Sequence, residues 1–164
     1  MSVRGLALPL AFAVLLIGGC STNDSGDVTT LNNTRQIAGA WSGELRQQGQ
    51  APFGMAVDIG GDGTGRVAYT GLECGGGWTL DGTQPSAPPR YIFTEKIKQG
   101  SGGACKGTGT VTLSPIQRHS PNGPAYTRLN YLFAGGGVTS RGLLHRVHAP
   151  ELAPVFKQAG VSSP

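Results

Sequence analysis

Charged residues are scarce in this sequence: Asp, Glu, Lys and Arg together make up 13% of the 164 residues. The 13 Lys and Arg residues are scattered along the chain, and no block of them could neutralise several phosphates together. Proteins that bind nucleic acid usually gather such charges on one stripe or face. The sequence therefore argues against a nucleic-acid partner and against strong electrostatic attraction to anionic lipid.

The motifs of the common enzyme classes are also missing. There is no Gly-x-Ser-x-Gly elbow, and no set of Ser, His and acid stands out for nucleophilic catalysis. The glycine-rich stretch 60–65 leads into a strand pattern, whereas a phosphate cradle needs a following helix N-terminus. His145 and His148 are three residues apart and would point to opposite faces of a strand, so they would not share a metal ion. We expect a protein that is not an enzyme and that has neither metal nor cofactor.

The sequence has one long apolar run, residues 6–17. This run is too short for a transmembrane helix, which needs about 20 residues. The run follows the positive charge of Arg4, and this pattern predicts a signal peptide over residues 1–19. The tetrad 17–20 (IGGC) resembles the lipobox of bacterial lipoproteins. The resemblance implies cleavage before Cys20, acyl chains such as palmitate on that cysteine, and an anchor in the cell membrane or outer membrane on its extracytoplasmic side. The alternative is an ordinary secretory signal peptide in which the cysteine is incidental.

Cysteine is rare, with three residues in the chain. If Cys20 carries lipid, Cys74 and Cys105 remain, and the oxidising environment of an exported protein favours their pairing. A zinc site is the rival interpretation, but it needs about four ligands at short spacing, and neither cysteine has another cysteine or a histidine within a few residues. We predict a disulfide between Cys74 and Cys105.

Glycine (28 residues) and proline (11 residues) are abundant, and both favour tight turns. The segment 20–35 begins with Cys20, which the lipobox resemblance implies is lipidated. Residues 21–35 are small and polar, which predicts a flexible tether. Residues 36–147 alternate between apolar and polar side chains in short runs, which is typical of strands. Eight neighbouring strands remove their edges most simply by closing into an up-and-down barrel, and a flattened sandwich is the alternative. The predicted strands are 37–47, 53–59, 65–70, 74–80, 90–98, 107–113, 126–133 and 138–147.

The fold class we predict is therefore all-β: an eight-stranded antiparallel, calycin-like barrel. The last segment, 148–164, is predicted to be a tail containing a short amphipathic helix over 150–159. Leu152, Val155 and Phe156 would share one face of this helix, and Gly160 would end it.

One acidic residue interrupts an apolar face. Glu95 shares the parity of Tyr91, Phe93 and Ile97, and in the last strand Arg146 shares the parity of Leu144. A buried carboxylate is costly unless it is paired. We predict that Glu95 and Arg146 form an ion pair inside the barrel or at its mouth.

Several short pieces of the chain, taken in order, resemble a group of small extracytoplasmic domains of actinobacteria. These domains occur as lipoproteins or beyond the membrane helix of serine/threonine kinases. The resemblance implies a sensor-like or scaffold β-domain with a disulfide between the two cysteines and no catalytic residues. The pieces are 39–43 (GAWSG), 69–74 (YTGLEC) with Gly76 and Trp78, 95–97 (EKI) with Gly100, 109–113 (GTVTL) after Cys105, and 142–146 (GLLHR).

The opening Gly-x-Trp also resembles that of calycin barrels such as lipocalins, which implies a small apolar ligand. The expected function is thus a non-enzymatic, lipid-anchored envelope protein whose barrel binds a protein partner or acts as a scaffold. The alternatives are a carrier of a small apolar ligand and an inhibitor of a foreign hydrolase that uses the loop 84–89 as a wedge. A carrier cavity would be lined by Trp41, Phe53, Tyr69, Trp78, Phe93 and Tyr131.

Overall fold

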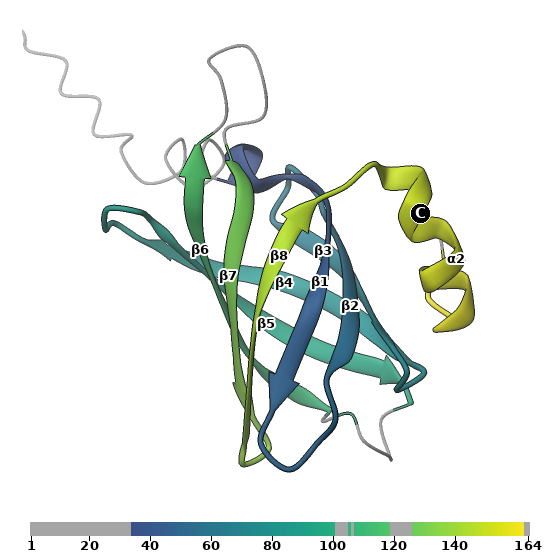
Figure 1. Cartoon of the computed structure of the whole chain (residues 1–164). Helices are drawn as coiled ribbons and strands as arrows, with labels where there is room; N and C mark the ends of the chain where they lie inside the picture. Colours follow the sequence, from purple (N-terminus) through teal and green to yellow (C-terminus); the bar gives the residue numbers. More distant parts are fainter. Residues whose placement is uncertain (1–33, 101–104, 106, 119–125, 163–164) are drawn as a thin grey trace, which may run out of the picture.

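The computed structural model describes residues 34–100, 105, 107–118 and 126–162. The predicted signal peptide, Cys20 and the tether up to residue 33 lie outside the described residues. Within these ranges the main elements are eight strands and a C-terminal helix (Figure 1). They are β1 (Gly39–Gln47), β2 (Phe53–Ile59), β3 (Thr64–Thr70), β4 (Cys74–Gln84), β5 (Arg90–Gln99), β6 (Thr108–Arg118), β7 (Tyr126–Gly135), β8 (Val138–Arg146) and α2 (Ala149–Gln158).

The strands form one closed barrel. Each strand pairs antiparallel with the next, and β8 pairs antiparallel with β1, which leaves no sheet edge. The predicted all-β fold, an eight-stranded antiparallel barrel with a short C-terminal helix, is confirmed, and the sandwich alternative is wrong.

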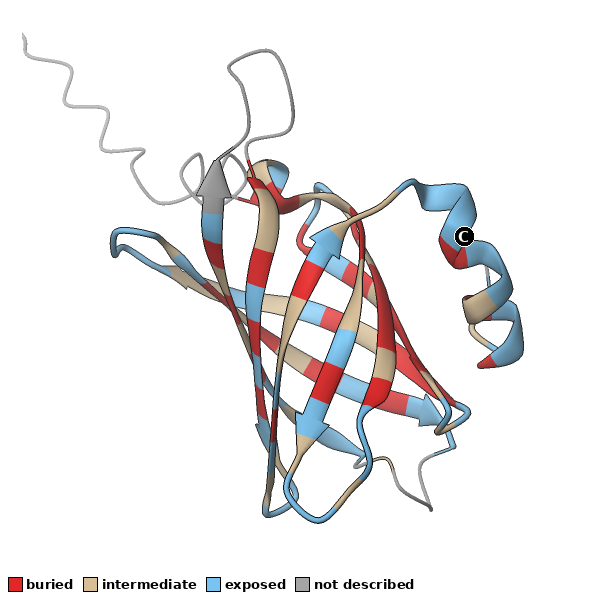
Figure 2. Ribbon diagram, viewed as in Figure 1, coloured by how far each residue is buried: buried red, intermediate tan, exposed pale blue. Residues whose placement is uncertain are grey.

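The strands form where the two-residue alternation places apolar side chains inside the barrel. In β5, Tyr91, Phe93, Glu95 and Ile97 are buried, whereas Lys96 is exposed. Much of β7 alternates in the same way, whereas β2 and β3 have consecutive buried residues because their outward alanines lie under the C-terminal helix (Figure 2). The inward side chains of all eight strands therefore share a single interior.

Two strands run further than the sequence pattern indicated. β4 continues to Gln84 and β6 to Arg118. Both contain register shifts, between Leu80 and Gly82 in β4 and after Pro115 in β6. An inserted residue turns the next side chains to the other face, so the alternation breaks although the strand continues.

Glycine permits the closest strand contacts. A Cβ atom on Gly76 of β4 would collide with the backbone oxygen of Lys96 in β5, and one on Gly43 of β1 would collide with the backbone oxygen of Leu143 in β8. Strands that coil tightly around a small barrel leave no room for a side chain at such points.

The helix α2 lies on the outer wall of the barrel, against β1, β2 and β3 (Figure 1). Its buried residues Leu152 and Phe156 pack on three alanines that face outward from these strands, Ala40, Ala56 and Ala68. Small residues let the helix approach the wall closely. The predicted amphipathic helix is therefore present, and it covers the wall of the barrel.

One end of the barrel is closed by the chain that enters β1. We call it the Trp41 end, because Trp41 is fully buried there near the start of β1. Residues 34–37 form a helical turn, and Thr34 and Ile37 of this turn are buried. The indole Nε1 of Trp41 donates a hydrogen bond to the Ile37 carbonyl oxygen at 2.8 Å. Thr34, the first described residue, is thus already packed, two residues before the predicted start of the domain.

Arg146, the last residue of β8, holds this end together. Its guanidinium carbon lies 4.3 Å from the centroid of the Trp41 ring, within cation–π distance. Its nitrogens donate to the carbonyl oxygens of Tyr126 at 3.0 Å, Ala38 at 2.8 Å and Gln36 at 3.4 Å. A single side chain therefore links three segments that are far apart in the sequence.

Replacing Arg146 with Met should lower the free energy of unfolding by about 1–3 kcal/mol, because carbonyl groups lose their donors and Trp41 loses its cation. Urea unfolding followed by circular dichroism measures the change. The matched control is Arg141→Met, since Arg141 lies on the same strand but is exposed, and it should change stability by less than about 0.5 kcal/mol. Equal effects of the two substitutions would contradict this role of Arg146.

Candidate functional site

The interior of the barrel is largely filled by its own side chains. The Trp78 ring lies 5.5 Å from the Phe93 ring and 6.2 Å from the Tyr131 ring, measured between centroids, and it is stacked on Tyr131. The Phe53 and Tyr69 rings meet edge to face at 5.9 Å. These five aromatic side chains come from five different strands, and each is at most 9% exposed. They make a packed core of the kind expected inside a barrel of eight strands.

A small pocket remains at the other end of the barrel. We call this the disulfide end, because Cys74 and Cys105 lie there. The pocket contains a cavity of about 30 Å³, which has room for a group of the size of a water molecule. It is lined by Gln47, Phe53, Tyr69, Leu72, Glu95, Ile97, Cys105, Tyr131, Phe133, Val138 and Ser140.

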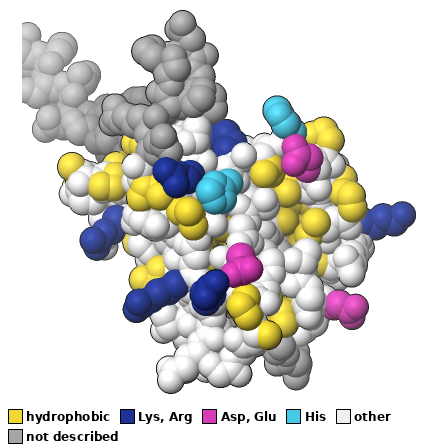
Figure 3. Space-filling model, in the orientation of Figure 1, with side chains coloured by type: hydrophobic (Ala, Val, Ile, Leu, Met, Phe, Trp, Pro, Cys, Tyr) yellow, Lys and Arg dark blue, Asp and Glu magenta, His cyan; other side chains and the backbone are white. Residues whose placement is uncertain are grey.

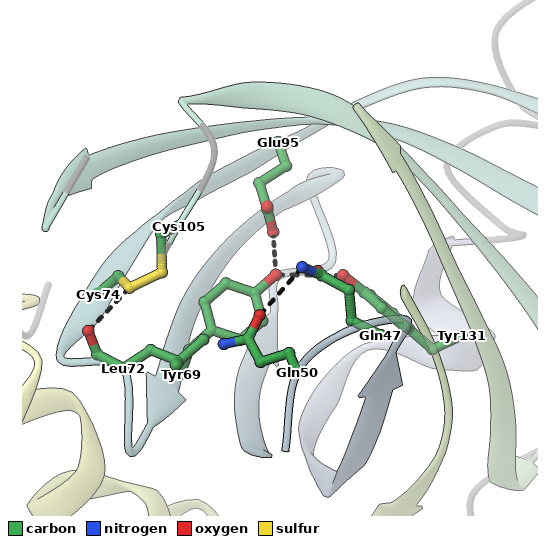
Figure 4. The surroundings of a disulfide bond; sticks show 8 residues. All are labelled: Gln47, Gln50, Tyr69, Leu72, Cys74, Glu95, Cys105 and Tyr131. Carbon is green, nitrogen blue, oxygen red and sulfur yellow. Dashed lines mark hydrogen bonds between the residues drawn. A yellow bond between two sulfur atoms is a disulfide. The ribbon is translucent and has the colours of Figure 1, made fainter. Parts of the chain in front are cut away.

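The Glu95 carboxyl group is the acidic group of this pocket (Figure 4). Its Oε2 atom accepts a hydrogen bond from the Tyr69 hydroxyl at 2.6 Å and another from the Trp78 indole Nε1 at 2.7 Å. The Tyr69 hydroxyl is also 3.1 Å from the Tyr131 hydroxyl. Since Tyr69 donates to Glu95, Tyr131 is the donor in the second contact. No described residue donates a hydrogen bond to Oε1 of Glu95.

Burial controls the protonation of this cluster. Glu95 is 2% exposed, and its burial raises the pKa of the carboxyl group above its ordinary value, although the hydrogen bonds from Tyr69 and Trp78 act in the opposite direction. Burial, followed by the neighbouring Tyr131 and Glu95, raises the pKa of Tyr69 well above its ordinary value. The pKa of Tyr131 is also well above its ordinary value, mainly because of burial. Both tyrosines are therefore neutral hydrogen-bond donors at physiological pH.

No cation balances Glu95 within the described part of the chain. The ion pairs among these residues are Arg46–Glu44 at 3.3 Å and Arg66–Asp58 at 2.9 Å, and both lie on outward-facing positions. Figure 3 shows Lys, Arg, Asp and Glu side chains on the surface of one face of the molecule, some of opposite charge next to each other. The charge that would neutralise an ionised Glu95 is absent from its surroundings among the described residues.

The predicted ion pair between Glu95 and Arg146 is wrong. Both side chains have the expected inward parity, but they lie at different heights in the barrel. Glu95 is in the middle of β5 beside Trp78, whereas Arg146 ends β8 beside Trp41. Parity determines which face of the sheet a side chain occupies, and it does not determine the distance along the barrel axis.

The predicted disulfide is present. Cys74, the first residue of β4, is bonded to Cys105 in the segment between β5 and β6, with their Cα atoms 6.4 Å apart (Figure 4). Cys105 also lines the pocket. The disulfide therefore fastens two connections to each other at the pocket end of the barrel.

The structure divides the six aromatic residues that were expected to line one cavity. Phe53, Tyr69 and Tyr131 line the pocket at the disulfide end. Trp78 donates to Glu95, and Phe93 packs on Trp78. The sixth, Trp41, belongs to the opposite end of the barrel.

Two polar residues of the pocket were not singled out from the sequence. The Ser140 hydroxyl donates to Oε1 of Gln47 at 2.7 Å, and Nε2 of Gln47 donates to Oε1 of Gln50 at 3.0 Å. The signal that could have found them is parity, because Gln47 shares the inward face of Leu45 and Ser140 shares that of Leu144.

The loop between β4 and β5 projects from the barrel wall (Figure 1). Pro85, Ser86, Ala87 and Pro88 are exposed, and the Ser86 hydroxyl donates to the Pro88 carbonyl oxygen at 2.5 Å. Most of the predicted wedge, residues 84–89, is thus accessible to a partner.

Comparisons of the chain with protein-family models, with curated proteins and with solved structures found no match. Within the described ranges, no helix is long and apolar enough to cross a membrane. The same ranges contain no group of three or more His, Cys, Asp or Glu side chains that could hold a metal ion.

Glu95→Gln should increase stability relative to the wild type, and the increase should grow with pH. Because the folded-state pKa of Glu95 is raised, the folded protein favours the protonated form, and stability is lost as the pH rises through that pKa. Gln is neutral at every pH and avoids this loss. Urea unfolding at pH 4 and at pH 8 measures the two differences.

The control for this prediction is Glu44→Gln, because the Glu44 side chain is 60% exposed. Its stability difference from the wild type should be nearly the same at both pH values. A Glu95→Gln difference that does not rise between pH 4 and pH 8 would contradict the assignment of Glu95 as a buried carboxyl group with a raised pKa.

Proposed function

We propose that the chain is a non-enzymatic, lipid-anchored protein of the cell envelope, and that its β-barrel is a binding or scaffold module. The observation that carries the proposal is the closed barrel whose interior is occupied by its own side chains. Such a barrel is a rigid body that can present its surface and its ends to a partner. The disulfide supports the same interpretation, because disulfides persist in extracytoplasmic compartments.

The position of Thr34 supports an orientation for the anchored protein. Thr34 lies at the Trp41 end of the barrel, a short distance along the chain from Cys20. A flexible tether of this length spans about 20 Å on average. On this proposal the Trp41 end stays close to the bilayer, and the disulfide end with its pocket points away from it.

The filled interior argues against a carrier of a small apolar ligand. Pockets for such ligands usually enclose about 300–1,000 Å³. The cavity at the disulfide end measures about 30 Å³ and contains a carboxyl group. The cavity is therefore too small for an apolar ligand of that size, although much of its lining is apolar.

Inhibition of a foreign hydrolase is the second candidate function, favoured by the exposed loop that projects between β4 and β5. Replacing Pro85 and Pro88 with Gly would make this loop more flexible. If the loop is the wedge, the substitutions should weaken inhibition of the target hydrolase in an enzyme assay. The protein should stay folded, because losing two prolines lowers the free energy of unfolding by only about 1–2 kcal/mol.

The lipid anchor is tested by mass spectrometry of the protein purified from the membranes of its own organism. We expect a chain that begins at Cys20, carries acyl groups and contains the disulfide. Cys20→Ala should abolish acylation and cleavage at this position. The control is the double variant Cys74→Ala and Cys105→Ala, which should lose the disulfide but remain acylated. A mature chain with an unmodified Cys20 thiol would show an ordinary secretory protein instead.

A further inference from the structure

The Glu95 carboxyl group is buried inside the barrel and has no cationic partner among the described residues. Burying an ionised carboxylate costs several kcal/mol unless a cation or strong donors compensate for the lost water. Glu95 is 2% exposed, and among the described residues it has two donors and no cationic partner. A buried acid in a concave site, without a structural counter-ion, is a candidate for ligand binding.

The two oxygens of this carboxyl group differ. Tyr69 and Trp78 both donate to Oε2, which fixes the orientation of the group. No described residue donates to Oε1, and Glu95 is part of the wall of the cavity. Oε1 of Glu95 is therefore a fixed acceptor that a hydrogen-bond donor of a ligand could use, because no described residue donates to it.

The remaining walls favour a positively charged donor. Four aromatic residues, Phe53, Tyr69, Tyr131 and Phe133, are part of the lining, and aromatic side chains are common neighbours of bound cations. Gln47 and Ser140 contribute further polar atoms to the lining. No described Lys or Arg lines the pocket to repel a cation.

We propose that the pocket at the disulfide end binds a primary ammonium group, with Oε1 of Glu95 as the acceptor. The cavity of about 30 Å³ admits an ammonium head and excludes a quaternary ammonium group of several times that volume. The rest of the ligand would extend out of the pocket, past the described lining residues at this end of the barrel. This inference rests on the proposed role as a binding module, but it does not depend on the lipid anchor. The ammonium group comes either from a free amine or from the lysine side chain of a partner.

The indole NMR signals of the two tryptophans can measure ligand binding in the pocket. The chain contains two Trp residues, so a 1H–15N spectrum shows two indole signals. The Trp78 indole donates to the Glu95 carboxylate and reports on the pocket, whereas the Trp41 indole donates to Ile37 at the other end and serves as an internal control. The mature chain, purified in detergent micelles, is titrated at pH 8 with n-butylammonium and with Nα-acetyl-lysine methylamide, and tetramethylammonium is the comparison.

Both primary amines should shift the Trp78 signal in a saturable way and leave the Trp41 signal in place. Tighter binding of n-butylammonium would indicate a free amine as the ligand, and tighter binding of Nα-acetyl-lysine methylamide would indicate a lysine side chain of a partner. Tetramethylammonium should have no such effect. Glu95→Gln should weaken binding at least about tenfold, since a charge-assisted hydrogen bond is lost. The exposed-site control Glu44→Gln should bind like the wild type.

A second measurement uses the wild type alone and keeps the proposal testable if Glu95→Gln does not fold. The Trp78 signal should follow the titration of Glu95, and saturating n-butylammonium should move the midpoint to lower pH, because a bound cation favours the ionised carboxylate. An unmoved midpoint, equal shifts with tetramethylammonium, or no saturable shift would overturn the proposal and leave a site that holds water only. Mass spectrometry detects the acyl groups independently of the spectrum. An acylated chain whose Trp78 signal does not respond to the amines would therefore contradict ammonium binding but not the lipid anchor.

Discussion

The pairing of β8 with β1 is the constraint on which the rest of this structure depends. It closes the sheet, removes both edges and makes the inner faces of all eight strands line one narrow space. Residues far apart in the sequence, such as Tyr69, Glu95 and Tyr131, become neighbours only because the sheet is closed. The outer faces of the strands form one continuous wall, and α2 packs on the outward-facing alanines of this wall.

The two ends of this interior are stabilised by different chemistry. At the Trp41 end, a guanidinium group rests on an indole ring and ties backbone carbonyls together, so the end is closed by packing and hydrogen bonds. At the disulfide end, a covalent bond fastens the connections, and a carboxyl group with two donors remains beside a small cavity. If the anchor is as proposed, the closed Trp41 end lies near the bilayer and the polar disulfide end points away from it.

Most of the fold could be predicted because side-chain alternation with a period of two is a local property. The alternation of Tyr91, Phe93, Glu95 and Ile97 identified β5 and the inward direction of Glu95. The extensions of β4 and β6 could not be predicted, since bulges reverse the alternation. The helical turn at Thr34 also escaped prediction, because its burial depends on the barrel end that it covers.

The sequence by itself determined the number of strands, their order, the inward faces of most side chains outside the bulges, and the pairing of Cys74 with Cys105. The tertiary structure alone decided how high each inward side chain lies along the barrel axis, because strand tilt and register set that height. Glu95 therefore meets Tyr69 and Trp78, while Arg146 meets Trp41, although parity allowed the two charges to meet each other. The size of the cavity inside the barrel also depends on the three-dimensional packing of the side chains. This size distinguishes a barrel filled by its own side chains from a barrel that could carry a ligand.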